Sequence, residues 1–223
     1  MRFNLIWFML LAGALLLAGC GDSKTDEKTP TKSPVARAAK TTDDSEKTTN
    51  GSPSQLKPEI AKVVLSAEEE ATCIVKQGDQ FPEAKLPDLA GSVQTVSALR
   101  GEKATVVVLW TDQNRAGRRA IINSSRQAKE DLPGVAYVGI NAGDDPADAK
   151  QAAEKAETQF PVLLDKDLSF FKQVVQVPSG REPADLVPRV YLLDAQGKIL
   201  WMSVAFQEAD ERDLANALRF VLE

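Results

Sequence analysis

The sequence predicts an α/β fold in which helices flank a mixed central sheet. Two apolar runs, ATVVVLW at 104–110 and VAYVGIN at 135–141, have the Val-rich composition of strands that are buried on both faces. Each run is followed by a helical pattern, and the chain closes with a hairpin pattern and a last helix. Strands that alternate with helices and end in this way are typical of an α/β sandwich.

The first elements are short. Residues 58–76 are expected to begin as a short helix and to end as an extended segment. Residues 85–99 are expected to form two strands around a turn at Gly91, with Val93 and Val96 as apolar positions. The strand at 104–110 then occupies the centre of the sheet.

Helix signals are clear in the middle of the chain. A helix is predicted from about Asn114 to Leu132, where the Pro-Gly pair at 133–134 stops it. After the second buried strand, Asp145 and Pro146 supply the N-cap and first turn of an Ala-rich helix that runs to Thr158.

The C-terminal third contains the remaining elements. Residues 160–165 are extended, residues 168–175 form one or two helical turns, and residues 189–204 form a hairpin. The last helix spans about 208–222. Its apolar face consists of Leu214, Leu218, Val221 and Leu222.

The N-terminal residues 1–19 have the features of a secretory signal. Arg2 precedes an apolar core that is shorter than the roughly 20 residues of a membrane span, and small residues stand directly before Cys20. The ending LAGC resembles the bacterial lipobox, which implies cleavage before Cys20 and lipidation of its thiol. An ordinary signal peptide or a short anchor helix with a chance cysteine is the alternative.

Residues 20–56 are predicted to be a disordered tether, because Ser, Thr, Lys, Asp and Pro dominate and little can be buried. Such a segment spans at most about 120 Å when extended and averages roughly 30–35 Å as a coil. The remaining residues, 57–223, are sufficient for one domain with a core. The expected location is the bacterial cell envelope, with the chain anchored by lipid and facing the periplasm or the exterior.

Composition excludes several kinds of chemistry. The 27 basic and 32 acidic residues leave a net charge of −5, which argues against a nucleic-acid partner. The chain has no His, so a Ser-His or Cys-His pair and a His metal site are excluded. With Cys20 lipidated, Cys73 is the only thiol, which excludes an internal disulfide and a cysteine zinc site. No cofactor or metal is expected.

Four segments carry a resemblance to a known family: KQGDQFPEAKLPDLAG, VSALRGEKATVVVLW, FPVLLDKD and VPRVYLLDAQGKIL. In this order and spacing they resemble the thioredoxin-fold redoxins, specifically the exported, membrane-tethered proteins related to TlpA and the AhpC/TSA group. The resemblance extends from about Lys76 to the end of the chain. It implies a thioredoxin-like sandwich.

The same resemblance shows a departure at the redox site. The family's strand-ending Trp, here Trp110, stands four residues before the first cysteine of a Cys-x-x-Cys pair. That pair falls on Asn114 and Gly117, while the usual following Arg is kept as Arg118. Dithiol exchange needs a thiolate and a resolving thiol, so it is excluded at this site. If the alignment is right, a double change to cysteine at Asn114 and Gly117 should form a disulfide without disrupting the fold.

The resemblance also implies a substrate groove. Val187 and Pro188 match the family's cis-proline segment, and Arg189 replaces the usual Thr after it. Arg115, Arg118, Arg119 and Arg189 are expected near one pole of the domain. They form either an anion site at the helix N-terminus or a solvated face. The candidate groove comprises Trp110, Asn114, Arg115, Gly117, Arg118, Val187, Pro188 and Arg189.

Cys73 has three interpretations. It is a half-buried apolar residue, a thiol that pairs between chains in a dimer, or a one-cysteine redox centre. The last ranks lowest, because nothing basic or helix-terminal adjoins Cys73 in the sequence.

The sequence favours a binding or scaffolding module that lacks the thiol redox site and leaves enzymatic activity open. The expected partner is an envelope protein or an extended peptide, with acidic character if the arginines form an anion site. The alternative is a divergent thiol–disulfide oxidoreductase or antioxidant redoxin that uses Cys73 or a partner's cysteine. A purely structural domain with no groove function is the third interpretation.

Overall fold

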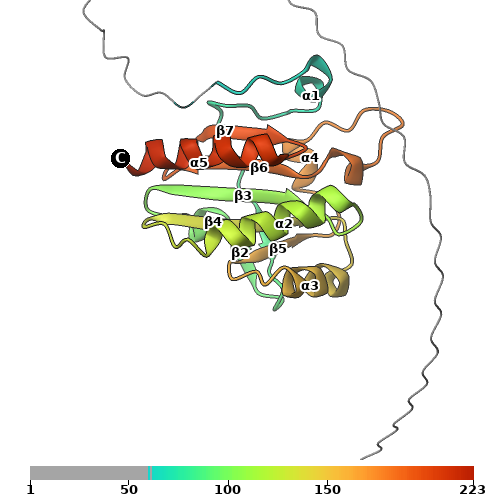
Figure 1. The fold of residues 1–223 in the computed structure, drawn as a ribbon. Helices are drawn as coiled ribbons and strands as arrows, with labels where there is room; N and C mark the ends of the chain where they lie inside the picture. Colours follow the sequence, from blue (N-terminus) through green and yellow to red (C-terminus); the bar gives the residue numbers. More distant parts are fainter. Residues whose placement is uncertain (1–59, 61) are drawn as a thin grey trace, which may run out of the picture. The chain divides into compact units, whose positions relative to one another are not determined.

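A five-stranded mixed sheet organises the domain in a computed structural model, which describes Ile60 and residues 62–223 (Figure 1). The strand order is β5-β4-β3-β6-β7. These strands are β3 (Ala104–Trp110), β4 (Val135–Ala142), β5 (Val162–Asp165), β6 (Arg189–Asp194) and β7 (Ile199–Val204). The β3–β4 and β4–β5 pairs are parallel, and the β3–β6 and β6–β7 pairs are antiparallel. The predicted α/β class with a mixed central sheet is confirmed.

Helices and short elements surround this sheet. The helices are α1 (Ala67–Ala71), α2 (Arg115–Ala128), α3 (Pro146–Lys155), α4 (Phe171–Val174) and α5 (Glu208–Leu222), with 3₁₀ turns at Ser97–Leu99 and Pro183–Leu186. A separate two-stranded sheet pairs β1 (Lys85–Pro87) with β2 (Val93–Thr95). Among the described residues, no helix is long and apolar enough to cross a membrane.

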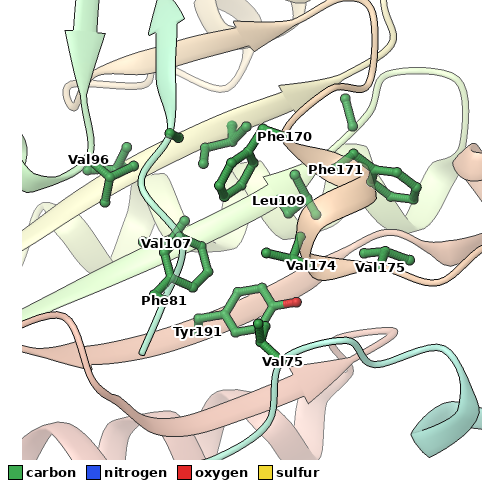
Figure 2. Close-up of a cluster of buried hydrophobic side chains, with 14 of the residues drawn as sticks. Val75, Phe81, Val96, Val107, Leu109, Phe170, Phe171, Val174, Val175 and Tyr191 are labelled. Carbon is green, nitrogen blue, oxygen red and sulfur yellow. The ribbon is translucent and has the colours of Figure 1, made fainter. Parts of the chain in front are cut away.

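The central strands are buried on both faces, as their apolar runs predict. All seven residues of β3 are buried. Alternate residues point to opposite faces, so Val107 and Leu109 enter one core cluster while Val106 and Val108 enter another. The first core packs against α4 and the segment before β1, as Figure 2 shows for Phe81 and its neighbours. The second core takes residues from α2, α3 and α5.

Three helix boundaries differ from the predictions. The first helix begins only at Ala67, because Ser66 forms a capping box there with Glu69. Helix α2 ends at Ala128 rather than at Leu132. The N–H groups of the next three residues bond to carbonyls three residues back, and the last of these residues, Asp131, adopts a φ of 47°.

Helix α3 ends at Lys155 instead of Thr158, since Glu157 turns the chain with a φ of 52°.

Four predictions concern N-terminal residues that lie outside the described part of the chain. They are the signal at 1–19, lipidation at Cys20, the tether at 20–56 and the domain start at residue 57.

Candidate functional site

The turn between β3 and α2 is organised by Asn114. Its side-chain Oδ1 accepts a hydrogen bond from the Gly117 N–H at 2.6 Å, which makes Asn114 the N-cap of α2. Its Nδ2 donates to the carbonyl oxygens of Ala184 at 2.5 Å and Val187 at 3.3 Å. The Val187–Pro188 peptide bond is cis, as the resemblance implied. One amide therefore caps the helix and joins the turn to the cis-proline segment.

Gly117 is buried where the chain passes very close to the end of β3. A Cβ built there would lie 2.9 Å from the Thr111 nitrogen and closer still to the Thr111 carbonyl oxygen. Because both atoms belong to the backbone, a side chain at this position requires the turn to move. The expectation that two cysteines at Asn114 and Gly117 would leave the fold undisturbed is therefore wrong.

Trp110 is a core residue and does not line a groove. Its side chain is 0% exposed and lies in the second core cluster. Its indole N–H has no hydrogen-bond partner among the described residues. The backbone of Gly139 approaches this nitrogen closely, since a Cβ at Gly139 would lie 3.3 Å from it. Burial thus places Trp110 outside the candidate groove.

Arg189 does not join the other arginines, contrary to the expectation. It is 0% exposed, and it shares a face of β6 with Tyr191, on the opposite side of the sheet from α2. Arg115 and Arg119 are exposed on α2. Arg118 donates to the Asp112 carbonyl and lies 3.9 Å from the Asp112 carboxylate. The four-arginine cluster is not formed.

The guanidinium of Arg189 instead reaches the segment that contains Cys73. Its Nη1 donates to Cys73 Sγ at 3.2 Å, its Nη2 to Thr72 Oγ1 at 2.5 Å and its Nε to the Leu186 carbonyl at 3.0 Å. Cys73 is 9% exposed, and its thiol donates to the Glu69 carbonyl at 3.3 Å. Cys73 therefore has a basic neighbour that the sequence did not indicate, because the two residues lie far apart in the chain.

Asp144 is a residue of this end of the sheet that the sequence reasoning missed. It is 5% exposed and accepts hydrogen bonds from the Thr111 hydroxyl, the Asp112 N–H and the Asn141 amide, each at 2.6 Å. It thereby joins the turn after β3 to the turn after β4. The signal in the sequence was an acidic residue shortly after a predicted strand. It was missed because the adjacent Asp145, as the N-cap of the next helix, already explained why acidic residues occur there.

A cavity of about 250 Å³ lies beside the cis-proline segment, where Val187 lines it. Helix α1, the stretch before Pro188 and the end of β7 form its walls. The lining residues are Ser66, Glu68, Glu69, Thr72, Arg181, Asp185, Leu186, Val187, Val204 and Ala205. Three carboxylates and one guanidinium give these walls a net negative charge. Of the predicted groove residues, only Val187 lines this cavity.

The fold and this turn define a class of protein. A mixed five-stranded sheet, a helix that starts after the central strand and an adjacent cis-proline make this a thioredoxin-like domain. In the residues that the structure describes, no cluster of acidic or cysteine side chains could hold a metal ion.

The chain belongs to the Redoxin family, whose model matches residues 76–218. None of the curated proteins matches it in sequence. Among solved structures, it is similar to a protein disulfide isomerase candidate from Bacteroides thetaiotaomicron, with 19% identity, a TM-score of 0.58, and 68% of this chain and 92% of that chain covered.

Two further structures are similar to this domain. A thiol:disulfide interchange protein candidate, DsbE, from Chlorobium tepidum has 23% identity and a TM-score of 0.55, and covers 67% of this chain and 99% of its own. Peroxidoxin BcpB from Mycobacterium tuberculosis has 19% identity and a TM-score of 0.52, with coverages of 66% and 96%. At these identities the likeness concerns the fold.

Proposed function

We propose that this protein is a lipid-anchored binding module of the bacterial cell envelope, which holds an extended peptide of a partner protein beside its cis-proline segment. The supporting observation is that Asn114, which the sequence resemblance aligns with the first cysteine of the family's pair, ties the turn to Ala184 and Val187. An amide cannot exchange disulfides, whereas the cavity beside Val187 remains open to a ligand.

The chemistry of the cavity indicates which peptide fits. Glu68, Glu69 and Asp185 outnumber Arg181 on its walls. A basic side chain of the partner would be attracted into such a cavity, and this attraction weakens as salt shortens the screening length to about 8–10 Å or less. This assignment replaces the acidic partner expected from the arginines, because Arg189 is not available to bind one.

The test uses a photoreactive amino acid in place of Ala205, an exposed residue on the cavity rim, in cells that express the full chain. We expect a cross-linked partner that is lost when Asp185→Lys reverses a charge of the wall. The same photoreactive residue at Ala147, exposed on α3, should capture nothing. The peptide identified by mass spectrometry should then bind the purified protein, with affinity that falls about tenfold in Asp185→Lys, a loss of ~1.4 kcal/mol.

Glu154→Lys is the matched control, since it makes the same charge change on the exposed side of α3. Equal loss of binding in Glu154→Lys and Asp185→Lys would show a general charge effect and contradict the cavity as the site. An insulin-disulfide reduction assay tests the alternative that the protein is a thiol–disulfide oxidoreductase. We expect the wild type to reduce insulin no faster than Cys73→Ser does.

A further inference from the structure

The segment before α1 lies along β7, which is an edge strand of the main sheet (Figure 1). Val63 packs against both core clusters, whereas its neighbours Lys62 and Val64 are exposed, Val64 to 91%. The side-chain amide of Gln77 joins this segment to the strand. It accepts a hydrogen bond from the Val63 N–H at 3.1 Å and donates one to the Leu200 carbonyl at 2.8 Å. The exposed side chains of the segment therefore project from a backbone that is fixed to the sheet.

Two hollows of about 480 and 430 Å³ beside this segment have apolar and basic walls. Both are lined by Lys62 and Gln77, so they form one continuous surface, which we call the basic patch. Its exposed members include Lys62, Val64, Lys76, Lys198 and Phe220. Of the described residues that line the two hollows, one is acidic, Glu70, and it pairs with Lys76 at 2.7 Å. Three lysines and one carboxylate make the patch positive, although the whole chain has a net charge of −5.

The charge reverses toward the other end of β7. The hollow beside the end of β7 and the start of α5 is lined by one lysine and by three carboxylates, those of Glu69, Asp210 and Asp213. This hollow adjoins the acidic cavity beside Val187, because Glu69 and Val204 line both. The basic patch instead lies at the start of β7 and the end of α5. The domain is therefore basic and apolar at one end of its edge strand and acidic at the other.

We propose that the basic patch is a docking surface for an anionic phospholipid bilayer. The inference rests on the lipid anchor of the proposed function, and the position of the patch in the chain supports this occupant. Ile60, the first residue that the structure describes, lines the same hollow as Lys198, so the chain that leads back to Cys20 joins the domain at the patch. Lysines are attracted to an anionic leaflet, and the exposed Val64 and Phe220 supply apolar contact with the interface.

The patch adds orientation to the anchor. A few lysines bind a bilayer weakly on their own, but an anchored chain meets the surface at a high effective concentration, so a weak contact becomes effective. The same anionic surface repels the carboxylates at the other end of β7. Docking therefore turns the acidic cavity beside Val187 away from the lipid, where a basic segment of a partner can reach it.

The experiment uses the full chain purified from cells with its lipid and reconstituted into vesicles. A fluorescent amino acid replaces the exposed Val64, and its quenching by brominated lipids gives the ratio of docked to undocked domains. We expect this ratio to be at least about tenfold higher in vesicles of equal parts phosphatidylglycerol and phosphatidylcholine than in phosphatidylcholine alone. The same probe at Ala147, exposed on α3, should stay unquenched in both. Equal quenching of the Val64 probe in the two kinds of vesicle overturns the inference.

Charge reversal tests the lysines. Lys62→Glu combined with Lys198→Glu should lower the docked-to-undocked ratio in the anionic vesicles at least about tenfold, because attraction becomes repulsion. A salt concentration of about 1 M, which shortens the screening length to about 3 Å, should have a similar effect on the wild type. Lys150→Glu combined with Lys172→Glu is the matched control, since it makes the same charge change at exposed positions of α3 and α4. Equal losses in the two double variants would show a general charge effect and overturn the patch as the docking surface.

Flotation of the vesicles separates this inference from the proposed function. A chain that floats with the vesicles while its Val64 probe stays unquenched retains its anchor and overturns the docking surface alone. A chain that floats with neither kind of vesicle contradicts the lipid anchor and, with it, the docking surface. Peptide binding is measured independently of both, by cross-linking at Ala205.

Discussion

Asn114 combines two hydrogen-bonding roles that a cysteine at the same place could not both perform. Its oxygen accepts from the first turn of α2, and its nitrogen donates to two carbonyls of the cis-proline segment. A thiol is a weak donor and a weak acceptor. The amide therefore joins the turn to two segments, and Gly117 leaves no room for a side chain beside the Thr111 backbone.

Gly117→Ala should destabilise the domain although it removes a glycine from a helix. Higher helix propensity contributes up to about 1 kcal/mol in its favour. The new Cβ would meet two backbone atoms of Thr111, and overpacking of this kind costs about 1–3 kcal/mol or more. We expect a net loss of about 1–2 kcal/mol in urea unfolding. Ala116→Ser, at the exposed neighbouring position, should change the free energy of unfolding by less than about 0.5 kcal/mol. A more stable Gly117→Ala would disprove the close packing.

The contacts of single residues were the part of the site that the sequence predicted least well. Asn114 and Pro188 were placed correctly relative to each other, because a family pattern fixes their spacing. The contact between Cys73 and Arg189 joins distant segments, and no local periodicity reports it. The contacts of Arg189 depend on the face of β6 to which its side chain points. Arg189 is the first residue of β6, and the sequence does not fix at which residue the alternation of faces begins.

At the scale of elements, the junction between β5 and α4 depends on one buried carboxylate. Asp165 is 0% exposed and accepts hydrogen bonds from the Phe170 N–H at 3.1 Å and the Phe171 N–H at 2.6 Å. These contacts orient α4, which contributes Phe171 and Val174 to the first core. Burial nevertheless raises the pKa of Asp165, since desolvation outweighs the effect of the two N–H donors.

This raised pKa predicts a pH dependence of stability with a defined sign. The folded state binds the Asp165 proton more tightly than the unfolded state does. The resulting stabilisation is complete below the ordinary value of 3.8 and is lost as the pH rises through the folded-state pKa. The stability advantage of the wild type over Asp165→Asn, measured by urea unfolding, should therefore shrink as the pH rises above about 4.

Asp167→Asn provides a control of opposite sign two residues away. The side-chain and backbone hydrogen bonds of Ser169 lower the pKa of the exposed Asp167. The stabilisation that Asp167 contributes is present above the ordinary pKa of an aspartate and is lost as the pH falls. The stability advantage of the wild type over Asp167→Asn should therefore grow with pH. Identical pH profiles for both variants would contradict the burial argument for Asp165.

The elements that the sequence predicted best are those with many repeats of their pattern. Strand β3 was correct to the residue, and α5 presents Leu214 and Leu218 to the core as expected, although Val221 is only partly buried. Helix α1 was misplaced, because five residues carry too little periodicity to be located. The end of α2 was overestimated, since the left-handed Asp131 has no sequence signal of its own.

At the scale of the whole molecule, two features of the chain combine in one proposal. Among the residues that the structure describes, no helix is long and apolar enough to cross a membrane. The sequence before it offers LAGC at a suitable position and a long polar segment after it. Under the proposed function, a lipid anchor at Cys20 followed by a coil of this length would let the cavity beside Val187 sample partners within roughly 30–35 Å of the membrane on average.

The lipid anchor gives a prediction in which the chain carries its own control. Cys20→Ser should abolish labelling with a fatty-acid analogue and release the protein from the membrane fraction or leave it unprocessed, because only a thiol at this position accepts the lipid. Cys73→Ser changes the one other cysteine of the sequence and should leave both labelling and fractionation unchanged. Labelling that survives in Cys20→Ser would show that the lipobox interpretation is wrong. Loss of labelling without loss of partner cross-linking at Ala205 would show that the anchor positions the cavity without contributing to binding, as the proposed separation of tether and domain requires.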